Sequence, residues 1–128
     1  MNLPIQLRIW DEKYRCWDSE PILIHPDTQI LKQGRVIDFS IGYKDQTGRT
    51  IFVNDIVEFQ DYIKGQVKVI GRYLVTQQYL EAINDACFDC LFYHECAAVE
   101  HALRIIGNKH EHPELLENYT PKTTPLKY

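Results

Sequence analysis

The chain has 128 residues, of which 45% are hydrophobic and 25% are charged. This length and composition are those of a globular domain with one core, so we expect a single domain over residues 1–128. Fourteen basic residues against eighteen acidic residues give a net charge of −4. That charge argues against a protein that neutralises nucleic-acid phosphates or binds an anionic membrane, and no apolar run is long enough to span a bilayer.

The acidic excess lies in the C-terminal part of the sequence. Residues 1–72 contain ten basic and ten acidic residues, whereas residues 73–128 contain four basic and eight acidic residues, which accounts for the whole −4. Such asymmetry indicates either an acidic interaction face or an ordinary solvated surface. The neutral first part leaves room for a local basic patch.

The beginning of the sequence reads as β-strands. Apolar residues alternate with polar ones over residues 5–10, which predicts a strand with one buried face. Trp10 then falls on the polar face, where it covers a sheet edge or lines a surface groove. Residues 21–26 are a short apolar run bounded by prolines, which is typical of an edge strand, and residues 35–41 form a further predicted strand.

The clearest local signal is the segment 45–48. Asp45 in the first position and Gly48 in the fourth are typical of a type I turn closed by a glycine with a left-handed backbone. Strand-like runs flank this turn, so we predict a β-hairpin. A calcium loop is excluded, because Asp45 is not followed by the further carboxylates that an EF-hand needs.

More strands follow the hairpin. The alternation over residues 51–59 places Asp55 on the core side, unless a turn or bulge at residues 54–55 relieves it. A turn at residues 61–65 and a strand at residues 66–75 come next. Several short strands with frequent turns predict a small barrel or sandwich.

The pattern becomes helical after residue 77. Apolar residues recur at helical spacing over residues 79–86, whereas residues 97–106 remain open between helix and strand because the periodicity is ambiguous. Residues 113–117 read as a helical turn that begins with proline. The Pro/Thr-rich tail, residues 120–128, is expected to be frayed.

The cysteines form the one chemically suggestive pattern. The N-terminus lacks the features of a secretory signal, so we expect a cytoplasmic protein whose cysteines are thiols or ligands. A C-x2-C-x3-H-x-C pattern, which begins like many zinc sites, is formed by Cys87, Cys90, His94 and Cys96. These four lie within ten residues, whereas structural zinc sites usually place the second pair farther away. Buried thiols are therefore the leading interpretation, with zinc and a redox pair as alternatives.

No catalytic, cofactor-binding or metal residue is assigned from the sequence. It lacks a G-x-S-x-G motif, a glycine-rich phosphate loop and a nucleotide-binding fingerprint. The His-Glu-His triplet at residues 110–112 differs from H-E-x-x-H and precedes a proline, so we predict a solvated turn. We expect neither an enzyme nor a cofactor.

Three segments carry a recognisable pattern in a fixed order. Residues 6–11 are similar to F-R-A-W-D, and residues 41–57 are similar to T-G-L-K-D-x-N-G-K-E-I-Y-E-G-D-I-V. Residues 105–108, followed by residues 113–116, are similar to V-I-G-N-I-Y-E-N-P-E-L-L. Together, over residues 6–117, they resemble the YopX-like proteins of phages and prophages.

The resemblance implies a mainly β (α+β) fold, with a small SH3-like barrel core and a helical or irregular C-terminal addition. It also implies phage or prophage origin, and it supplies no catalytic residue. In this reading Asp45, Gly48 and Gly107 are architectural. Two positions depart from the pattern: Asn54 replaces a glycine but tolerates a turn, and His112 replaces an asparagine and is a weaker helix cap.

The leading functional hypothesis is a small non-enzymatic accessory or interaction protein with an unknown protein partner. Its binding groove is expected near Trp10, Trp17 or Tyr43. A nucleic-acid-binding barrel is an alternative, although the net charge disfavours it. A zinc-stabilised module around residues 87–96 is another. Homo-oligomerisation stays open, and no membrane partner is expected.

Overall fold

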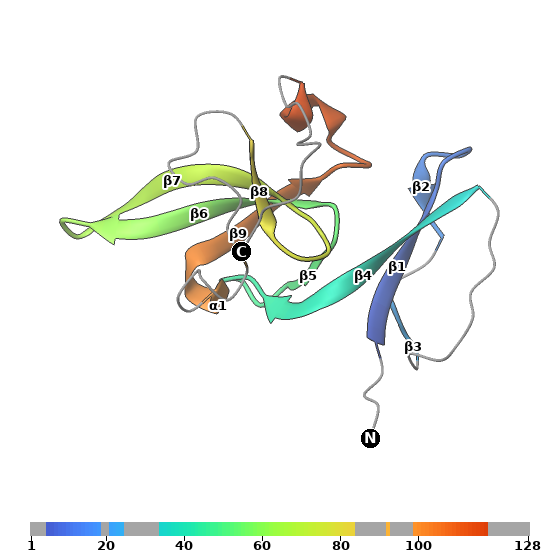
Figure 1. Ribbon diagram of the computed structural model, residues 1–128, viewed down its shortest axis with the longest axis horizontal. Coiled ribbons are helices and arrows are strands. Elements are labelled where there is room, and N and C mark those ends of the chain that lie inside the picture. The colour runs from blue at the N-terminus through green and yellow to red at the C-terminus, as the bar shows by residue number, and fades with distance from the viewer. Residues whose placement is uncertain (1–4, 19–20, 25–33, 84–91, 93–98, 118–128) are drawn as a thin grey trace.

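The computed structural model describes residues 5–18, 21–24, 34–83, 92 and 99–117. Most of the regular structure in these residues is strand, as Figure 1 shows. The elements in sequence order are β1 (Ile5–Asp11), β2 (Cys16–Trp17), β3 (Ile22–Ile24), β4 (Arg35–Lys44), β5 (Thr50–Phe52), β6 (Asp55–Ile63), β7 (Gln66–Val75), β8 (Leu80–Ile83), α1 (Val99–Ala102), β9 (Leu103–Asn108) and η2 (Pro113–Leu116).

The first sheet is built around β1 and β4. These strands pair antiparallel, and Arg8 on β1 lies opposite Asp38 on β4. β5 pairs with the other edge of β4, while the short strands β2 and β3 both pair with β1. The predicted strand between the prolines is thus confirmed as β3, and it lies at the edge of the sheet.

The predicted hairpin joins β4 to β5. The Gly48 N–H donates a hydrogen bond to the Asp45 carbonyl at 3.0 Å. Gly48 has a φ of 88°, a conformation that a residue with a Cβ rarely adopts. The turn at residues 45–48 and its left-handed glycine are therefore confirmed.

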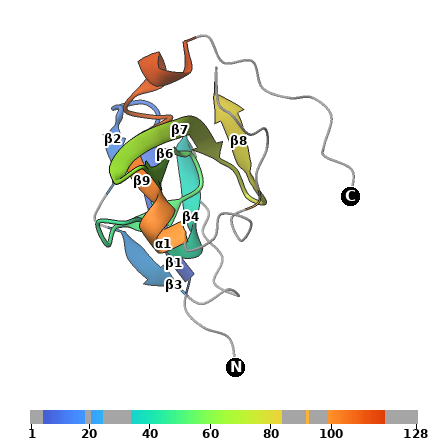
Figure 2. The ribbon, with the colours of Figure 1, turned by 90° about the vertical axis from the view of Figure 1, so that its left-hand side faces the viewer.

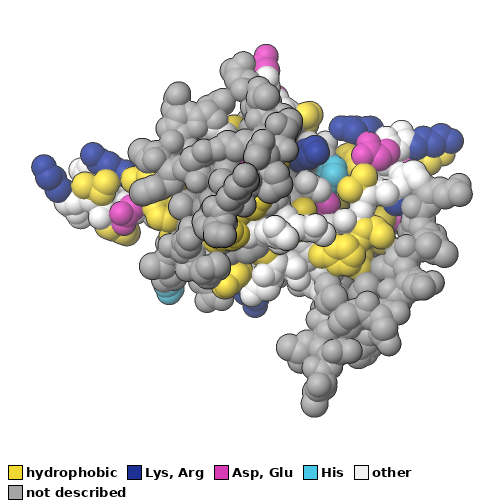
Figure 3. Space-filling view, viewed as in Figure 1, with side chains coloured by type: hydrophobic (Ala, Val, Ile, Leu, Met, Phe, Trp, Pro, Cys, Tyr) yellow, Lys and Arg dark blue, Asp and Glu magenta, His cyan; other side chains and the backbone are white. Residues whose placement is uncertain are grey.

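The second sheet has the strand order β8-β7-β6-β9. Its β6–β7 hairpin closes through Lys64 and Gly65, which both have positive φ (54° and 79°), as a two-residue hairpin loop of type I′ requires. The turn is narrower than the predicted 61–65, because the ladder continues as far as Ile63. The hairpin projects from the rest of the molecule with Tyr62 and Val67 exposed (Figures 1 and 3).

The two sheets meet at the turn between β5 and β6. Asn54 in this turn has a φ of 74°, and its N–H donates to the Val75 carbonyl on β7 at 2.8 Å. Its carbonyl accepts a 2.8 Å hydrogen bond from Lys109, just after β9. The strands curl around this junction into a small barrel-like β fold, as the two views show (Figures 1 and 2), so the mainly β prediction is confirmed. The main core is formed by Ile51, Val57, Tyr73, Val75, Leu80, Leu103 and Ile105.

One stretch with a helical prediction is a strand. Residues 80–83 form β8, because a turn closed by the Thr76 N–H and the Tyr79 carbonyl folds the backbone back along β7. Antiparallel pairing with a core strand outweighs the weak helical spacing of so few residues. The helical prediction for residues 79–86 is therefore wrong over β8, and the positions beyond Ile83 lie outside the described residues.

The open stretch before the last predicted turn divides into two elements. α1 is a single helical turn, and β9 follows it directly as an antiparallel neighbour of β6. The predicted helical turn at its C-terminal side is confirmed as the 3₁₀ helix η2. Residues 97–98, the cysteine pattern within residues 87–96 and the tail 120–128 lie outside the described residues.

Candidate functional site

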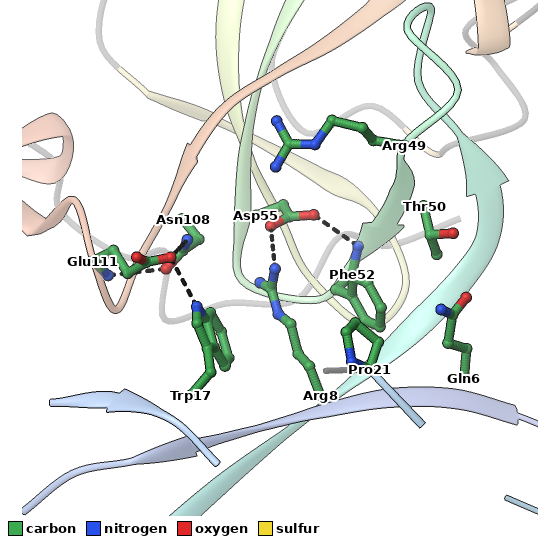
Figure 4. A pocket seen from close by; sticks show the side chains of 10 residues that line it. All are labelled: Gln6, Arg8, Trp17, Pro21, Arg49, Thr50, Phe52, Asp55, Asn108 and Glu111. Carbon is green, nitrogen blue, oxygen red and sulfur yellow. Dashed lines mark hydrogen bonds and ion pairs between the residues drawn. The ribbon is translucent and has the colours of Figure 1, made fainter. Parts of the chain in front are cut away.

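A cavity of about 650 Å³ lies between the two sheets, where β1 and β5 face the end of β9 (Figure 4). All three segments that resemble the YopX-like motifs contribute side chains to it. The cavity combines charged, polar and aromatic groups. Its lining residues are Gln6, Arg8, Trp17, Pro21, Arg49, Thr50, Phe52, Asp55, Asn108 and Glu111.

Arg8 is the most enclosed cation of this cavity, with its side chain 11% exposed. Its Nε lies 3.1 Å from Asp38 Oδ2, and its Nη1 lies 2.8 Å from Asp55 Oδ1. The guanidinium carbon also lies 4.5 Å from the centroid of a Trp17 ring and 4.8 Å from that of Phe52. Two carboxylates and two aromatic rings therefore hold one guanidinium, which is a fixed charge rather than a mobile surface group.

Asp38 connects this cation to the rest of the junction. Its Oδ1 accepts a 2.7 Å hydrogen bond from Asn54 Nδ2, and its Oδ2 lies 2.9 Å from His110 Nε2 as well as close to Arg8. The carboxylate is fully buried, so these donors replace the water that it loses on folding. We call Arg8, Asp38, Asn54, Asp55 and His110 the inter-sheet cluster.

Asp55 lies inside the protein at 1% exposure. Its Oδ2 accepts a 2.8 Å hydrogen bond from the Phe52 N–H, and its Oδ1 contacts Arg8. Burial raises the pKa of Asp55 to about 6, although Arg8 and the Phe52 hydrogen bond act in the lowering direction. The predicted turn at residue 54 is present, but it does not move Asp55 out of the core. Arg8 provides the compensation instead.

Trp10 lines a second surface pocket together with Trp17 and His110, as one predicted alternative had it, but it is far more buried than the polar face of a strand predicts. The alternation places it on the polar face of β1, yet it is 2% exposed. Its ring stacks on His110 with centroids 5.3 Å apart, and it makes an edge contact with Trp17 at 4.9 Å. The Trp17 and His110 rings thus cover Trp10, whereas Gln6 and Arg8 on the same side of β1 are only partly buried. Tyr43, the third aromatic candidate, packs against the main core and does not line the cavity.

The segment after β9 is the predicted turn, and Glu111 is exposed as expected, but His110 is buried. Asn108 Oδ1 accepts hydrogen bonds from the backbone N–H groups of His110 and Glu111. This turn directs the His110 ring to Asp38, and His110 is buried. The prediction failed because the buried partner of His110 lies 72 residues earlier in the sequence.

Glu111 faces the cavity from the same turn. Its Oε1 accepts hydrogen bonds from Asn108 Nδ2 and Trp17 Nε1, both at 2.9 Å. These two hydrogen bonds lower the pKa of Glu111, so the carboxylate is ionised at neutral pH. Figure 4 shows Trp17, Glu111 and Asn108 grouped at one side of the cavity.

Two departures in the motif segments have a visible role. Asn54 keeps the positive φ of the glycine that it replaces, and its amide adds the hydrogen bond to Asp38. His112 makes no side-chain cap on η2; its Nδ1 accepts the Asn108 N–H at 3.2 Å instead. A Cβ at Gly107 would lie 2.8 Å from that ring nitrogen, which agrees with the architectural reading of this glycine.

Sequence reasoning missed Arg8, Asp38 and the role of His110. Asp38 carried the usable signal, because it is a carboxylate between two apolar residues in the middle of a predicted strand. Arg8 gave no such signal, since a basic residue on the polar side of a strand is expected at the surface. Its partners lie 30 and 47 residues away in sequence; the β1–β4 register brings Asp38 opposite Arg8, and Asp55 reaches it from the other sheet.

The candidate metal ligands and membrane-spanning segments can be stated for the described residues. Cys16 is an exposed free thiol on β2, whereas Cys87, Cys90, His94 and Cys96 lie outside the described residues. Within the described ranges, no group of three or more His, Cys, Asp or Glu side chains is placed to hold a metal ion. Over the same residues, no helix combines the length and apolar character needed to cross a membrane.

Fold and site define a class of protein: a small barrel-like β protein whose two sheets are joined by a buried cluster of charged residues. The chain belongs to the YopX family, because the family model described as YopX protein matches residues 11–117, most of its length. This confirms the resemblance. No curated protein matches the sequence.

Proposed function

We propose that this YopX-family protein is a small non-enzymatic interaction module, of phage or prophage origin, that binds a protein partner in the inter-sheet cavity. The observation that carries the proposal is that the buried charges beside the cavity already have fixed partners within the protein. Both oxygens of Asp55 are engaged, by Arg8 and by the Phe52 N–H. A general base needs an oxygen that is free to receive a proton from substrate, so this carboxylate is poorly placed for catalysis.

Side chains that already have fixed partners within the protein are also suited to binding another protein. A surface whose side chains are held before a partner arrives loses little conformational entropy on binding. The cavity also offers aromatic surface beside polar groups, a combination that is common where protein partners dock. Trp17 supplies such an anchor, because its indole N–H is fixed on Glu111 and one of its rings lies under the Arg8 guanidinium.

Two alternatives remain predictions. A nucleic-acid-binding role would need a basic surface, and the cavity instead contains Asp55 and Glu111 beside its two arginines. A zinc-stabilised element would involve cysteines outside the described residues. No observation on the described residues favours either.

Site-specific photo-crosslinking tests the proposal. A photoreactive amino acid is placed at Thr50 on the cavity wall, or at the exposed Gln77 in the β7–β8 turn as a matched control. Each full-length variant is irradiated in host cells that carry the phage genes, and adducts are identified by mass spectrometry. We expect one discrete protein adduct from position 50 and none from position 77. Absence of a position-50 adduct, or the same adducts from both positions, would contradict the proposal.

A further inference from the structure

The geometry points to Arg49 as the anchor for a single carboxylate of the partner protein, either that of an Asp or Glu side chain or that of the partner's C-terminus. This inference rests on the proposed function, since it names the chemical group that the cavity would recognise. It starts from a difference between the two arginines of the cavity. Arg8 forms ion pairs with Asp38 and Asp55. The Arg49 side chain, by contrast, makes no hydrogen bond or ion pair with the residues that the structure describes.

The backbone of Arg49 is held in place by the preceding turn. Its N–H donates to Asp45 Oδ1 at 3.0 Å, and its carbonyl accepts the Asp45 N–H at 2.8 Å. Asp45 is itself fixed, because its other oxygen accepts a 3.0 Å hydrogen bond from Ile105 on β9. The root of the side chain is therefore rigid, while the guanidinium reaches over the cavity above Asp55 (Figure 4).

The groups next to Arg49 suit a peptide. Thr50 and Gln6 line the same cavity, and their side chains make no hydrogen bonds with described residues. A hydroxyl and a carboxamide can each donate to and accept from a peptide backbone. Phe52 and Pro21 add apolar surface between these polar groups and Trp17. Among the described residues, Arg49 is thus the lining cation without an internal partner, and polar and apolar groups lie in the same cavity.

The charge around Arg49 favours a carboxylate over a nucleic acid. One guanidinium can bind one carboxylate through two parallel hydrogen bonds. A nucleic-acid strand carries a charge on every phosphate, so its binding depends on several cations in succession. Two of the four charged residues that line the cavity, Asp55 and Glu111, are acidic, so the described residues offer no row of cations for successive phosphates.

Nuclear magnetic resonance of the full-length protein tests this inference with defined probes. The probes are the blocked peptide acetyl-Ala-Asp-Ala-Ala-amide, its Asn counterpart, acetyl-Ala-Ala-Ala with a free carboxylate, and a ten-residue oligothymidylate. The reporters are the Arg49 Nε–H and the Trp17 indole N–H signals. We expect saturable shifts with at least one carboxylate peptide, at a Kd on the order of millimolar for so small a ligand. The Asn peptide should bind at least about tenfold more weakly.

Three variants separate a loss of carboxylate binding by the Arg49 side chain from a general disturbance of the fold. Arg49→Gln should weaken carboxylate binding at least about tenfold, and Arg49→Lys should give an intermediate loss because it keeps the charge but not the planar fork. Arg104→Gln removes an exposed arginine on β9 that does not line the cavity, and it should bind like the parent. Arg49 holds the turn only through backbone groups, so the variants should keep the parent's dispersed amide spectrum.

The outcomes distinguish this inference from the proposed function. Equal binding of the Asp and Asn peptides without binding of the free C-terminus, or unchanged binding by Arg49→Gln, overturns the role of Arg49. A position-50 crosslink to a protein would still stand in that case. Saturable shifts with the oligothymidylate alone overturn the carboxylate and point to nucleic acid. If the position-50 crosslink fails as well, the proposed function falls with it.

Discussion

Asp45 and Asp55 belong to the same stretch of sequence, and both are buried, but the protein holds their carboxylates in opposite ways. Asp45 accepts four hydrogen bonds, three of them from its own turn and one from β9. Burial alone would raise its pKa, yet these hydrogen bonds bring the pKa below the ordinary 3.8. Asp55 has one backbone donor and a share of Arg8, and its pKa is raised to about 6.

The difference shows that burial does not by itself decide the charge state of a carboxylate. The charge state also depends on the number of hydrogen-bond donors around the carboxylate and on how many acids share each donor. The Asp45 turn largely supplies its own donors. The inter-sheet cluster instead makes one guanidinium serve two carboxylates, so it depends on contacts between distant parts of the sequence.

The largest effect should come from removing the shared cation. Arg8→Met leaves Asp38 and Asp55 without their ion pair, and we expect the free energy of unfolding to fall by about 3–5 kcal/mol. Urea denaturation followed by tryptophan fluorescence measures it. Arg72→Met is the matched control, because the pair between Arg72 and Glu58 is half-exposed and should contribute about 1 kcal/mol or less. Similar losses in the two variants would contradict the shared-cation account.

Removing the Asp45 carboxylate, whose donors come mostly from its own turn, should lower the unfolding free energy somewhat less. Asp45→Ala deprives a buried Ile105 N–H of its acceptor and opens the turn, so we expect a loss of about 2–4 kcal/mol in unfolding free energy. Asp61→Ala serves as the control, because Asp61 is exposed and should change stability by about 0.5 kcal/mol or less. A loss at position 45 no larger than at position 61 would show that the turn does not need its carboxylate.

The pH dependence should separate the two acids by sign. The raised pKa of Asp55 means that the folded state binds its proton more tightly than the unfolded state does. Its contribution to stability is therefore complete below about pH 4 and is lost as the pH rises through about 6. From about pH 4.5 to about pH 7 we expect a decrease of about 2 kcal/mol, which Asp55→Asn should abolish. Asp45 acts in the opposite direction: its contribution is present above its ordinary pKa and is lost at lower pH.

Urea unfolding at both pH values compares the parent with Asp55→Asn. Other titrating groups contribute equally to both proteins. The difference between the two proteins in how the unfolding free energy changes with pH therefore isolates Asp55. If the unfolding free energy of both proteins changes equally with pH, the folded and unfolded states bind the Asp55 proton with the same affinity.

The smallest effect should come from the residue that replaces glycine. Asn54→Gly keeps the positive φ but loses the hydrogen bond to Asp38, so we expect a loss of about 1 kcal/mol by thermal or urea unfolding. Lys64→Gly is the matched control, since Lys64 also has positive φ and lies in the exposed hairpin loop. It should be neutral or slightly stabilising. An Asn54→Gly protein as stable as the parent would remove Asn54 from the cluster's energetics.

Local chemistry in the sequence predicted the local parts of the fold. The turn at Asp45 and Gly48, the edge strand β3 and the 3₁₀ turn at Pro113 all follow from residues that lie within a few positions of one another. β8 was missed because its spacing is compatible with a helix, and only pairing with β7 decides the matter. The spacing of apolar residues within four positions does not reveal pairing with a neighbouring strand, even one that ends only five residues earlier.

The site was less accessible from the sequence than the fold. Trp17 is a predicted candidate and does line the cavity, but Trp10 is buried where the alternation predicts exposure. The interpretation of His110 failed for the same reason as that of Trp10. Each depends on an element that packs over β1 from a distant part of the sequence, so the alternation within one strand could not reveal it.

The long reach of these contacts has a consequence for biosynthesis. Trp17 and Glu111 are 94 residues apart, and Arg15 donates to the His110 carbonyl across 95 residues. At about 5–20 residues per second, a ribosome needs roughly 5–20 s to deliver the second partner after the first. During that interval the nascent β1 carries Trp10 without the stacking His110, and β4, once translated, carries Asp38 without its imidazole donor. β1 therefore precedes its partners His110 and Glu111 in synthesis by most of the sequence, and its contacts are among the last to be completed.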